Sequence, residues 1–144
     1  VTELVPQKSA VGLKNVTISE PFFEGHFPNH SVLPGALIIE SLAQLTAIVY
    51  GSSLIAEAEA TAEPDERVDV LKLAVAARVG YLVSIRNMKF MRPVVPGDQM
   101  ILKATIVGKF SIFSQVKVSA HVEHFCVAEG ILGVSQVPEP EENL

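Results

Sequence analysis

Hydrophobic positions gather first into one long, nearly continuous run that follows Pro34-Gly35. Between residues 36 and 56 two thirds of the positions are apolar. A proline near the first turn is typical of a helix N-terminus, and apolar residues on all sides are typical of a buried helix. The pattern therefore predicts one long central helix over these residues.

The polar exceptions within this helix share one face. Glu40, Gln44, Ala47 and Gly51 follow one another at spacings of four, three and four residues, which places them along one side. Because a charged carboxylate is almost never fully buried alone, Glu40 is expected either to pair with a base or to be held as the neutral acid. Gln44 is placed to hold that carboxyl through a hydrogen bond. The alternative is that both side chains simply point to solvent.

The rest of the chain shows shorter runs with the alternation of strands. Residues 81–90 form the first run after the helix, and three more follow through short links. The expected strands are a hairpin strand over residues 1–17, clearest at 13–18 and with a turn at 6–8, followed by residues 81–90, 100–107, 110–122 and 125–137. Strands joined in this way predict an antiparallel sheet. We therefore expect a single α+β domain over residues 1–144, in which a curved sheet wraps the helix and exposed sheet edges favour a dimer.

The segments between these elements differ in character. Residues 20–35 are rich in proline, glycine and aromatic residues and are expected to form a structured loop. Residues 57–69 are acidic and predict a solvated, mobile connection, while residues 70–77 fit either a short helix or a strand. Residues 138–144 form an acidic tail.

Composition and charge narrow the classes of function. The 144-residue chain is long enough for one core without a disulfide or metal. Its net charge of −5 comes from acidic clusters at 57–66 and 139–142, and the remainder is near neutral, which argues against nucleic-acid binding but allows a modest basic patch for an acidic partner. A single cysteine, no signal peptide and no apolar run of roughly 20 residues predict a cytoplasmic protein without a membrane span. The chain opens on Val1 rather than methionine, as a processed or truncated N-terminus would.

Two features near the start of the helix could carry chemistry. His26 lies in the loop among aromatic residues and prolines, a setting in which a neutral imidazole can act as a general base; the alternative is a loop histidine that bonds a nearby carbonyl. The N–H of Gly35 lies at the helix N-terminus, where it could stabilise a thioester carbonyl that gains negative charge.

A metal site is not expected. His121, His124 and Cys126 are close in sequence, but no second cluster of ligands supports them. Cys126 is better interpreted as a small buried hydrophobic residue.

Four blocks of sequence now point to a family. The blocks are residues 20–28 (EPFFEGHFP), 33–35 (LPG), 37–44 (LIIESLAQ) and 92–99 (RPVVPGDQ). Together they resemble the 3-hydroxyacyl-acyl-carrier-protein dehydratases of type II fatty acid synthesis, and the likeness extends from about residue 5 to residue 133. The resemblance implies a hot-dog fold, a homodimer with a continuous sheet and active sites shared across the interface, and assembly of three such dimers into a hexamer.

The same resemblance implies a role for each site residue. His26 would take the α-proton of a 3-hydroxyacyl thioester, and Glu40 from the partner chain would protonate the departing hydroxyl. Gly35 would polarise the carbonyl through its N–H, and Gln44 would orient Glu40. No cofactor would be needed, because the substrate is carried on the phosphopantetheine of acyl carrier protein. Glutamate rather than aspartate at position 40 predicts the simple dehydratase rather than the isomerising branch.

Some positions depart from the family pattern. Asn29 and Ser31 stand where glycine and proline are usual, the segment 57–80 is longer than usual, and the segment before the first hairpin is missing. The resemblance thus implies a dehydratase of carrier-bound acyl chains in fatty acid or related polyketide synthesis. The alternatives are a hot-dog thioesterase or enoyl-CoA hydratase, or a non-catalytic acyl-binding subunit.

A set of three bases is a candidate contact for an acidic carrier protein. Arg86, Lys89 and Arg92 lie on or just after the strand expected at residues 81–90. The alternative is an ordinary charged strand edge, because scattered surface bases are common.

Overall fold

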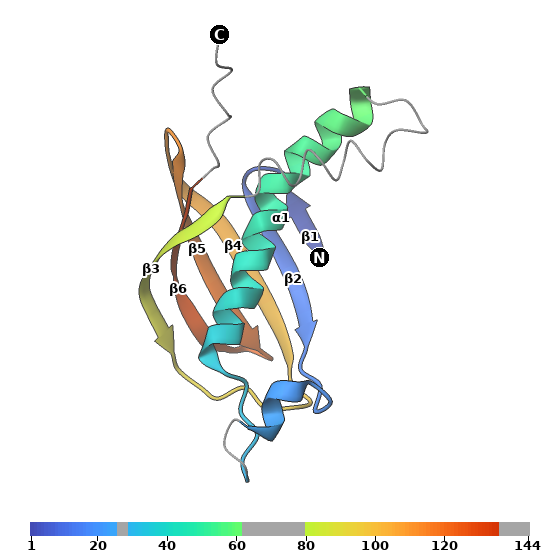
Figure 1. Cartoon of the computed structure of the whole chain (residues 1–144), viewed down its shortest axis with the longest axis vertical. Helices are drawn as coiled ribbons and strands as arrows, with labels where there is room; N and C mark the ends of the chain where they lie inside the picture. Colours follow the sequence, from blue (N-terminus) through green and yellow to red (C-terminus); the bar gives the residue numbers. More distant parts are fainter. Residues whose placement is uncertain (26–28, 62–79, 136–144) are drawn as a thin grey trace.

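The computed structural model of the chain describes residues 1–25, 29–61 and 80–135, with only the backbone described at helix positions 53, 54, 57–59 and 61 (Figure 1). The elements in chain order are β1 (Glu3–Val5), β2 (Ser9–Asn15), the 3₁₀ helix η1 (Pro21–Glu24), α1 (Gly35–Thr61), β3 (Tyr81–Phe90), β4 (Gln99–Phe110), β5 (Phe113–Val122) and β6 (Phe125–Ser135). The expectations for residues 70–77 and 138–144 lie outside the described residues.

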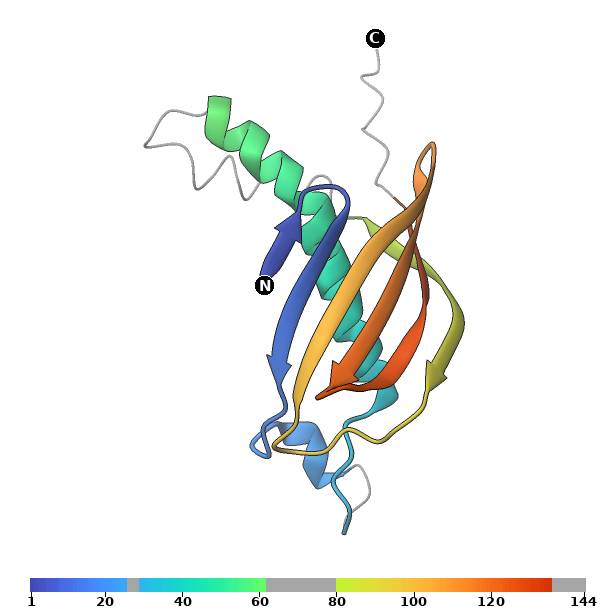
Figure 2. The ribbon, with the colours of Figure 1, turned by 180° about the vertical axis from the view of Figure 1, so that it is seen from behind.

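One curved sheet and one long helix make up the described part of the chain. The six strands are ordered β1-β2-β4-β5-β6-β3, and every neighbouring pair is antiparallel. Figures 1 and 2 show α1 lying along one face of this sheet, with its C-terminal turns extending past the sheet. The predicted α+β architecture, in which an antiparallel sheet wraps a central helix, is confirmed.

The inward side of α1 supplies much of the core. Ile38, Leu42, Leu45 and Val49 recur at spacings of three and four and are all at least 97% buried. On the sheet they meet the inward-facing residues Met100, Leu102, Ala104, Val116, Val118, Ala120, Val127 and Leu132. Each large apolar side chain buried in this way contributes roughly 1.5–3 kcal/mol to stability.

One stretch of this helix also passes a length-and-composition test for membrane spans. The stretch is Gly35–Ser52, so the expectation that no apolar run is long enough is wrong by this measure. The core helix of a soluble protein passes the same test, and the inward side of this stretch packs on the sheet. The finding is therefore weak evidence for a membrane.

Several element boundaries differ from those expected. The hairpin and its turn at residues 6–8 are as expected, but the strand signal that was clearest at residues 13–18 belongs to a strand, β2, that covers Ser9–Asn15. The whole length of β2 pairs with β4 from Thr105 to Gln99. The helix continues to Thr61, into residues assigned to the acidic connection. Alternating alanine and glutamate over residues 56–60 are strong helix formers, which accounts for the extension.

The hairpin between β4 and β5 also lies later than expected. β4 runs on to Phe110, and the turn falls at Ser111, whose φ is 46°. A register shift between Ile106 and Gly108 marks a bulge that lets the strand continue. The Phe110 ring covers Gly108, so a side chain at that glycine would press on the ring.

The loop before α1 is anchored to the turn between β3 and β4. Phe23 and Leu33 are both buried, and the Leu33 N–H donates to the carbonyl of Val94 at 2.7 Å. The Asp98 carboxylate in turn accepts from the Val95 N–H at 2.9 Å. Packing of this loop, which includes η1, fixes where the helix begins.

Candidate active site

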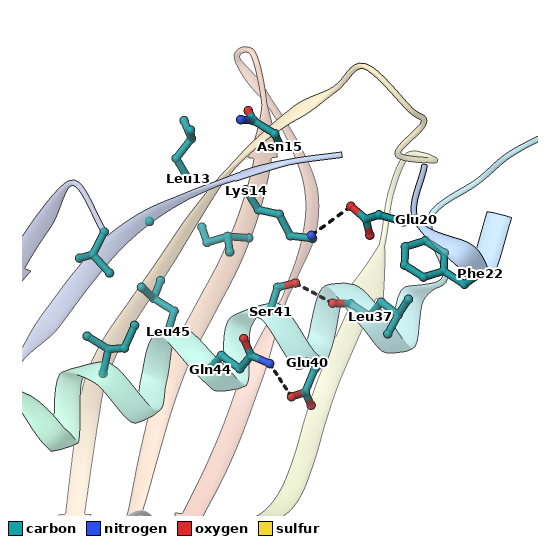
Figure 3. Close-up of a pocket in the computed structure, with 14 residues that line it drawn as sticks. Leu13, Lys14, Asn15, Glu20, Phe22, Leu37, Glu40, Ser41, Gln44 and Leu45 are labelled. Carbon is teal, nitrogen blue, oxygen red and sulfur yellow. Dashed lines mark hydrogen bonds and ion pairs between the residues drawn. The ribbon is translucent and has the colours of Figure 1, made fainter. Parts of the chain in front are cut away.

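Glu40 and Gln44 form a hydrogen-bonded pair on α1. The Gln44 Nε2 donates to the Glu40 Oε1 at 2.9 Å, and Figure 3 shows the two polar groups facing each other. The four-residue spacing puts both side chains on one face of the helix. The structure therefore brings together two of the predicted site residues in the arrangement expected for a held carboxyl.

Burial of Glu40 was not borne out in the single chain. Both Glu40 and Gln44 are exposed, because the sheet covers only the opposite side of α1. The reasoning from apolar neighbours failed because those neighbours belong to the inward side, whereas Glu40 shares its side with Gln44 and the exposed Ile48.

Gly35 is the first residue of α1. The carbonyl of Pro34 accepts the N–H groups of Leu37 at 2.9 Å and Ile38 at 3.3 Å, which closes the first turn. By helix geometry the Gly35 N–H has no acceptor within the helix, and it lies at the positive end of the helix dipole.

The ring of Phe90, at the end of β3, lies against Gly35. A Cβ at position 35 would be 2.9 Å from the ring's Cζ atom, so a larger residue would force the ring to move. The sequence did not single out Phe90, whose only signal was its place as the last residue of the strand expected at residues 81–90.

Two cavities meet at the Glu40–Gln44 pair. The larger, of about 560 Å³, lies between α1 and β2 (Figure 3). Its wall carries an ion pair between Lys14 and Glu20 at 3.4 Å and the side chain of Asn15. The smaller, of about 210 Å³, lies on the other side of the pair and is bounded by β3 and β6. A group bound in either cavity would therefore come close to the Glu40 carboxyl.

His26 lies outside the described residues. The nearest described neighbours along the chain are Gly25 and Asn29, both exposed. The roles of His26 as base and of Glu40 as acid therefore stay predictions.

The three bases considered for carrier binding are exposed and lie on one edge of the molecule. Arg86 and Lys89 belong to β3, and Lys89 faces Glu129 of β6 in the strand register. The guanidinium of Arg92 lies 3.6 Å from the centroid of the Phe125 ring, a cation–π contact that holds this side chain in place.

His121 and Cys126 lie on paired strands of the sheet and make contacts within it. The two residues are opposite each other in the β5–β6 register, and the half-buried Cys126 Sγ donates to the Ala128 carbonyl at 3.4 Å. Burial lowers the pKa of His121, the Lys103 charge lowers it further, and Glu129 opposes them. Burial also raises the pKa of the Cys126 thiol, with a smaller contribution from Glu129. Within residues 1–25, 29–61 and 80–135, no three potential ligands gather as a metal site would require.

A six-stranded antiparallel sheet wrapped on one helix defines a hot-dog protein, and here an acid and an amide lie where two cavities meet. Residues 1–131 match the FabA-like domain, so the chain belongs to that family. The predicted family and the hot-dog fold are confirmed.

Two dehydratases are similar to this chain over most of its length. The 3-hydroxyacyl-[acyl-carrier-protein] dehydratase FabZ of Nitrosospira multiformis is 43% identical over 129 residues, covering 84% of this chain and 77% of the relative. The dehydratase of the same name from Acidiphilium cryptum is 49% identical over 132 residues, covering 90% and 68%. Among solved structures, a hot-dog-like protein from Thermanaerovibrio acidaminovorans shares the fold with a TM-score of 0.66 at 16% identity, covering 93% of this chain and 84% of that one.

Proposed function

We propose that this chain dehydrates 3-hydroxyacyl thioesters carried on acyl carrier protein to trans-2-enoyl thioesters, in fatty acid synthesis. The observation that carries the proposal is the Glu40 carboxyl, held by Gln44 at 2.9 Å where two cavities meet, in a chain 43% and 49% identical to dehydratases of this reaction.

The proposed chemistry needs one base, one acid and one donor to the carbonyl. His26 removes the α-proton, and the electron pair moves onto the thioester oxygen, which the Gly35 N–H stabilises. Protonated Glu40 then gives its proton to the 3-hydroxyl as the carbon–oxygen bond breaks, so that water leaves and the α,β double bond forms. The thioester itself acidifies the α-carbon, so the proposal includes no cofactor beyond the carrier's phosphopantetheine. A cytoplasmic location accompanies it.

The proposal includes a homodimer joined along β3. This ten-residue strand is at one edge of the sheet, and its side chains are exposed on both faces, including Tyr81 at 67%, Val83 at 53% and Ile85 at 47%. A long apolar edge strand pairs readily with another strand. Pairing two copies there would extend the sheet and supply Glu40 to the neighbouring chain's loop; association of three such dimers is the further step expected from the family.

The dimer is tested by adding charge to the β3 edge. Val83→Lys with Ile85→Lys should halve the mass measured by light scattering, because two buried lysines per chain oppose pairing. Leu4→Lys with Val5→Lys, at the opposite edge of the sheet, is the matched control and should leave the mass unchanged. A β3 variant that keeps the native mass would remove the β3 interface from the proposal.

The proposal also includes a surface that binds acyl carrier protein. We assign it to Arg86, Lys89 and Arg92, which share the edge of the molecule formed by β3 and the segment after it. Reversing all three charges should raise KM for a carrier-bound substrate, because the acidic partner is then repelled, and leave KM for the same acyl group on CoA nearly unchanged. Because Arg86 and Lys89 belong to the strand proposed to join the dimer, the comparison requires that the variant keep the native mass in light scattering. Equal KM values for native and variant chains on carrier-bound substrate would exclude the patch.

The activity is tested by the reversible hydration of a short trans-2-enoyl thioester, followed through loss of enoyl absorbance. His26→Ala and Glu40→Gln should each lower kcat by about two to four orders of magnitude if these groups do acid–base work. Circular dichroism and thermal unfolding of each variant are the controls for folding. If the native chain is as inactive as both variants with several chain lengths and carriers, the acyl-binding subunit becomes the better account; release of free thiol would point instead to a thioesterase.

A further inference from the structure

The smaller cavity is a slot that runs beside α1 from the Glu40–Gln44 pair. Its volume is about 210 Å³. On the helix it is lined by Glu40, Ala43, Gln44, Thr46, Ala47 and Tyr50, and on the sheet by Gly80, Leu82 and Val134. The slot therefore follows one face of the helix from the proposed acid toward Tyr50.

The lining changes from polar to apolar along this direction. The small side chain of Ala43 lies between Glu40 and Gln44 along the helix, and that of Ala47 lies beyond them. The Thr46 hydroxyl donates to the Leu42 carbonyl at 2.9 Å and so has its hydrogen bond within the helix. The sheet side is the aliphatic wall of Leu82 and Val134. Such a surface suits a hydrocarbon chain whose polar head is at the acid.

Tyr50 is the last residue of the helix to line the slot. It follows Glu40 by ten positions, which corresponds to about 15 Å along the helix axis. Its ring packs against the hydrophobic core, and its hydroxyl lies near Ser114, a buried residue of β5. This packing holds the ring at the far end of the slot from Glu40.

The larger cavity is less suited than the smaller one to bind a hydrocarbon chain. Its wall carries the Lys14–Glu20 ion pair and Asn15, whose side chain accepts a hydrogen bond from Gln99 at 2.9 Å. An acyl chain lying there would bring methylenes against charged groups that favour water.

We propose that Tyr50 determines specificity by closing the acyl slot, so that the distance from Glu40 to its ring sets the longest acyl chain that the enzyme accepts efficiently. The inference rests on the proposed function, because it takes the thioester to react at Glu40. Each methylene that enters an apolar slot raises affinity by roughly fourfold, and this gain should stop once the chain end meets the ring.

The test compares the native chain with Tyr50→Ala, Tyr50→Phe and Ile48→Ala. kcat/KM is measured for trans-2-enoyl thioesters from crotonyl through hexenoyl, octenoyl and decenoyl to hexadecenoyl. Tyr50→Ala should move the optimum to longer chains and raise kcat/KM for the longest ones by about tenfold or more, as two or more methylenes gain contact. Tyr50→Phe keeps the ring and should keep the native optimum. Ile48→Ala, which alters the larger cavity, should also keep it.

A second measurement separates this inference from the proposed function. Dissociation constants of unreactive saturated acyl-CoAs of the same lengths do not depend on turnover, and the affinity gain per methylene should continue to longer chains only in Tyr50→Ala. If no chain length is turned over but this shift in binding is found, the proposed activity fails and the slot assignment stands. An unchanged length profile in Tyr50→Ala, an equal loss at every length, or a shift in Ile48→Ala instead would overturn the role of Tyr50.

Discussion

The two faces of α1 have different roles although they belong to one helix: one packs on the sheet, and the other carries the proposed site. The inward face presents Leu42 and Val49, which have no exposed surface and join the helix to the sheet. The outward face presents Glu40 and Gln44, which are exposed and bonded to each other. Stability and the proposed chemistry therefore reside on different sides of the same element, so single substitutions should separate them.

The largest expected effect is on the inward face. Leu42→Ala should lower the free energy of unfolding by about 2–5 kcal/mol, because it leaves a cavity in the core. Ile48→Ala, on the outward face and 42% exposed, should cost less than about 1 kcal/mol. Urea unfolding at one fixed protein concentration measures both; similar losses would mean that the two faces are not distinct in stability.

A smaller effect, on activity alone, is expected from Gln44→Leu. Loss of the hydrogen bond to Glu40 should lower kcat by about fivefold, since one such bond is worth about 1 kcal/mol and the acid is then less well oriented. The thermal midpoint should change little because Gln44 is exposed. Steady-state kinetics across pH should show an altered dependence on the acid's protonation as well as the lower kcat, and a native pH profile with native kcat would show that Gln44 has no positioning role.

The smallest effect lies away from both faces, on β5. Burial and Lys103 lower the pKa of His121, so the folded chain favours the neutral ring. Above the ordinary histidine pKa near 6.5 this stability is fully present, and it is lost as the pH falls toward the lower folded pKa, because the unfolded chain binds the proton first. His121→Gln should therefore show a slightly smaller fall in melting temperature between about pH 8 and about pH 5 than the native chain. An identical fall in both proteins would contradict the assignment.

The sequence predicted the fold well because the fold depends on local patterns. A long apolar run and a series of alternating runs are enough to indicate one helix and an antiparallel sheet, and the Glu40–Gln44 bond follows from helical spacing alone. The exposure of Glu40 could not be predicted, since it depends on which side of α1 the sheet covers. Contacts between segments distant in sequence, such as the Phe90 ring on Gly35, have no local signal either.

The hydrogen-bonded thiol of Cys126 gives the molecule a built-in reporter. It is the sole cysteine of the 144-residue chain, so a thiol reagent would modify one known atom. Because burial raises the thiol's pKa and the β5–β6 hairpin partly covers it, labelling of the native state should be slow and should follow transient opening of that hairpin. The rate of labelling would thus report how often the β5–β6 hairpin opens, without any engineered probe.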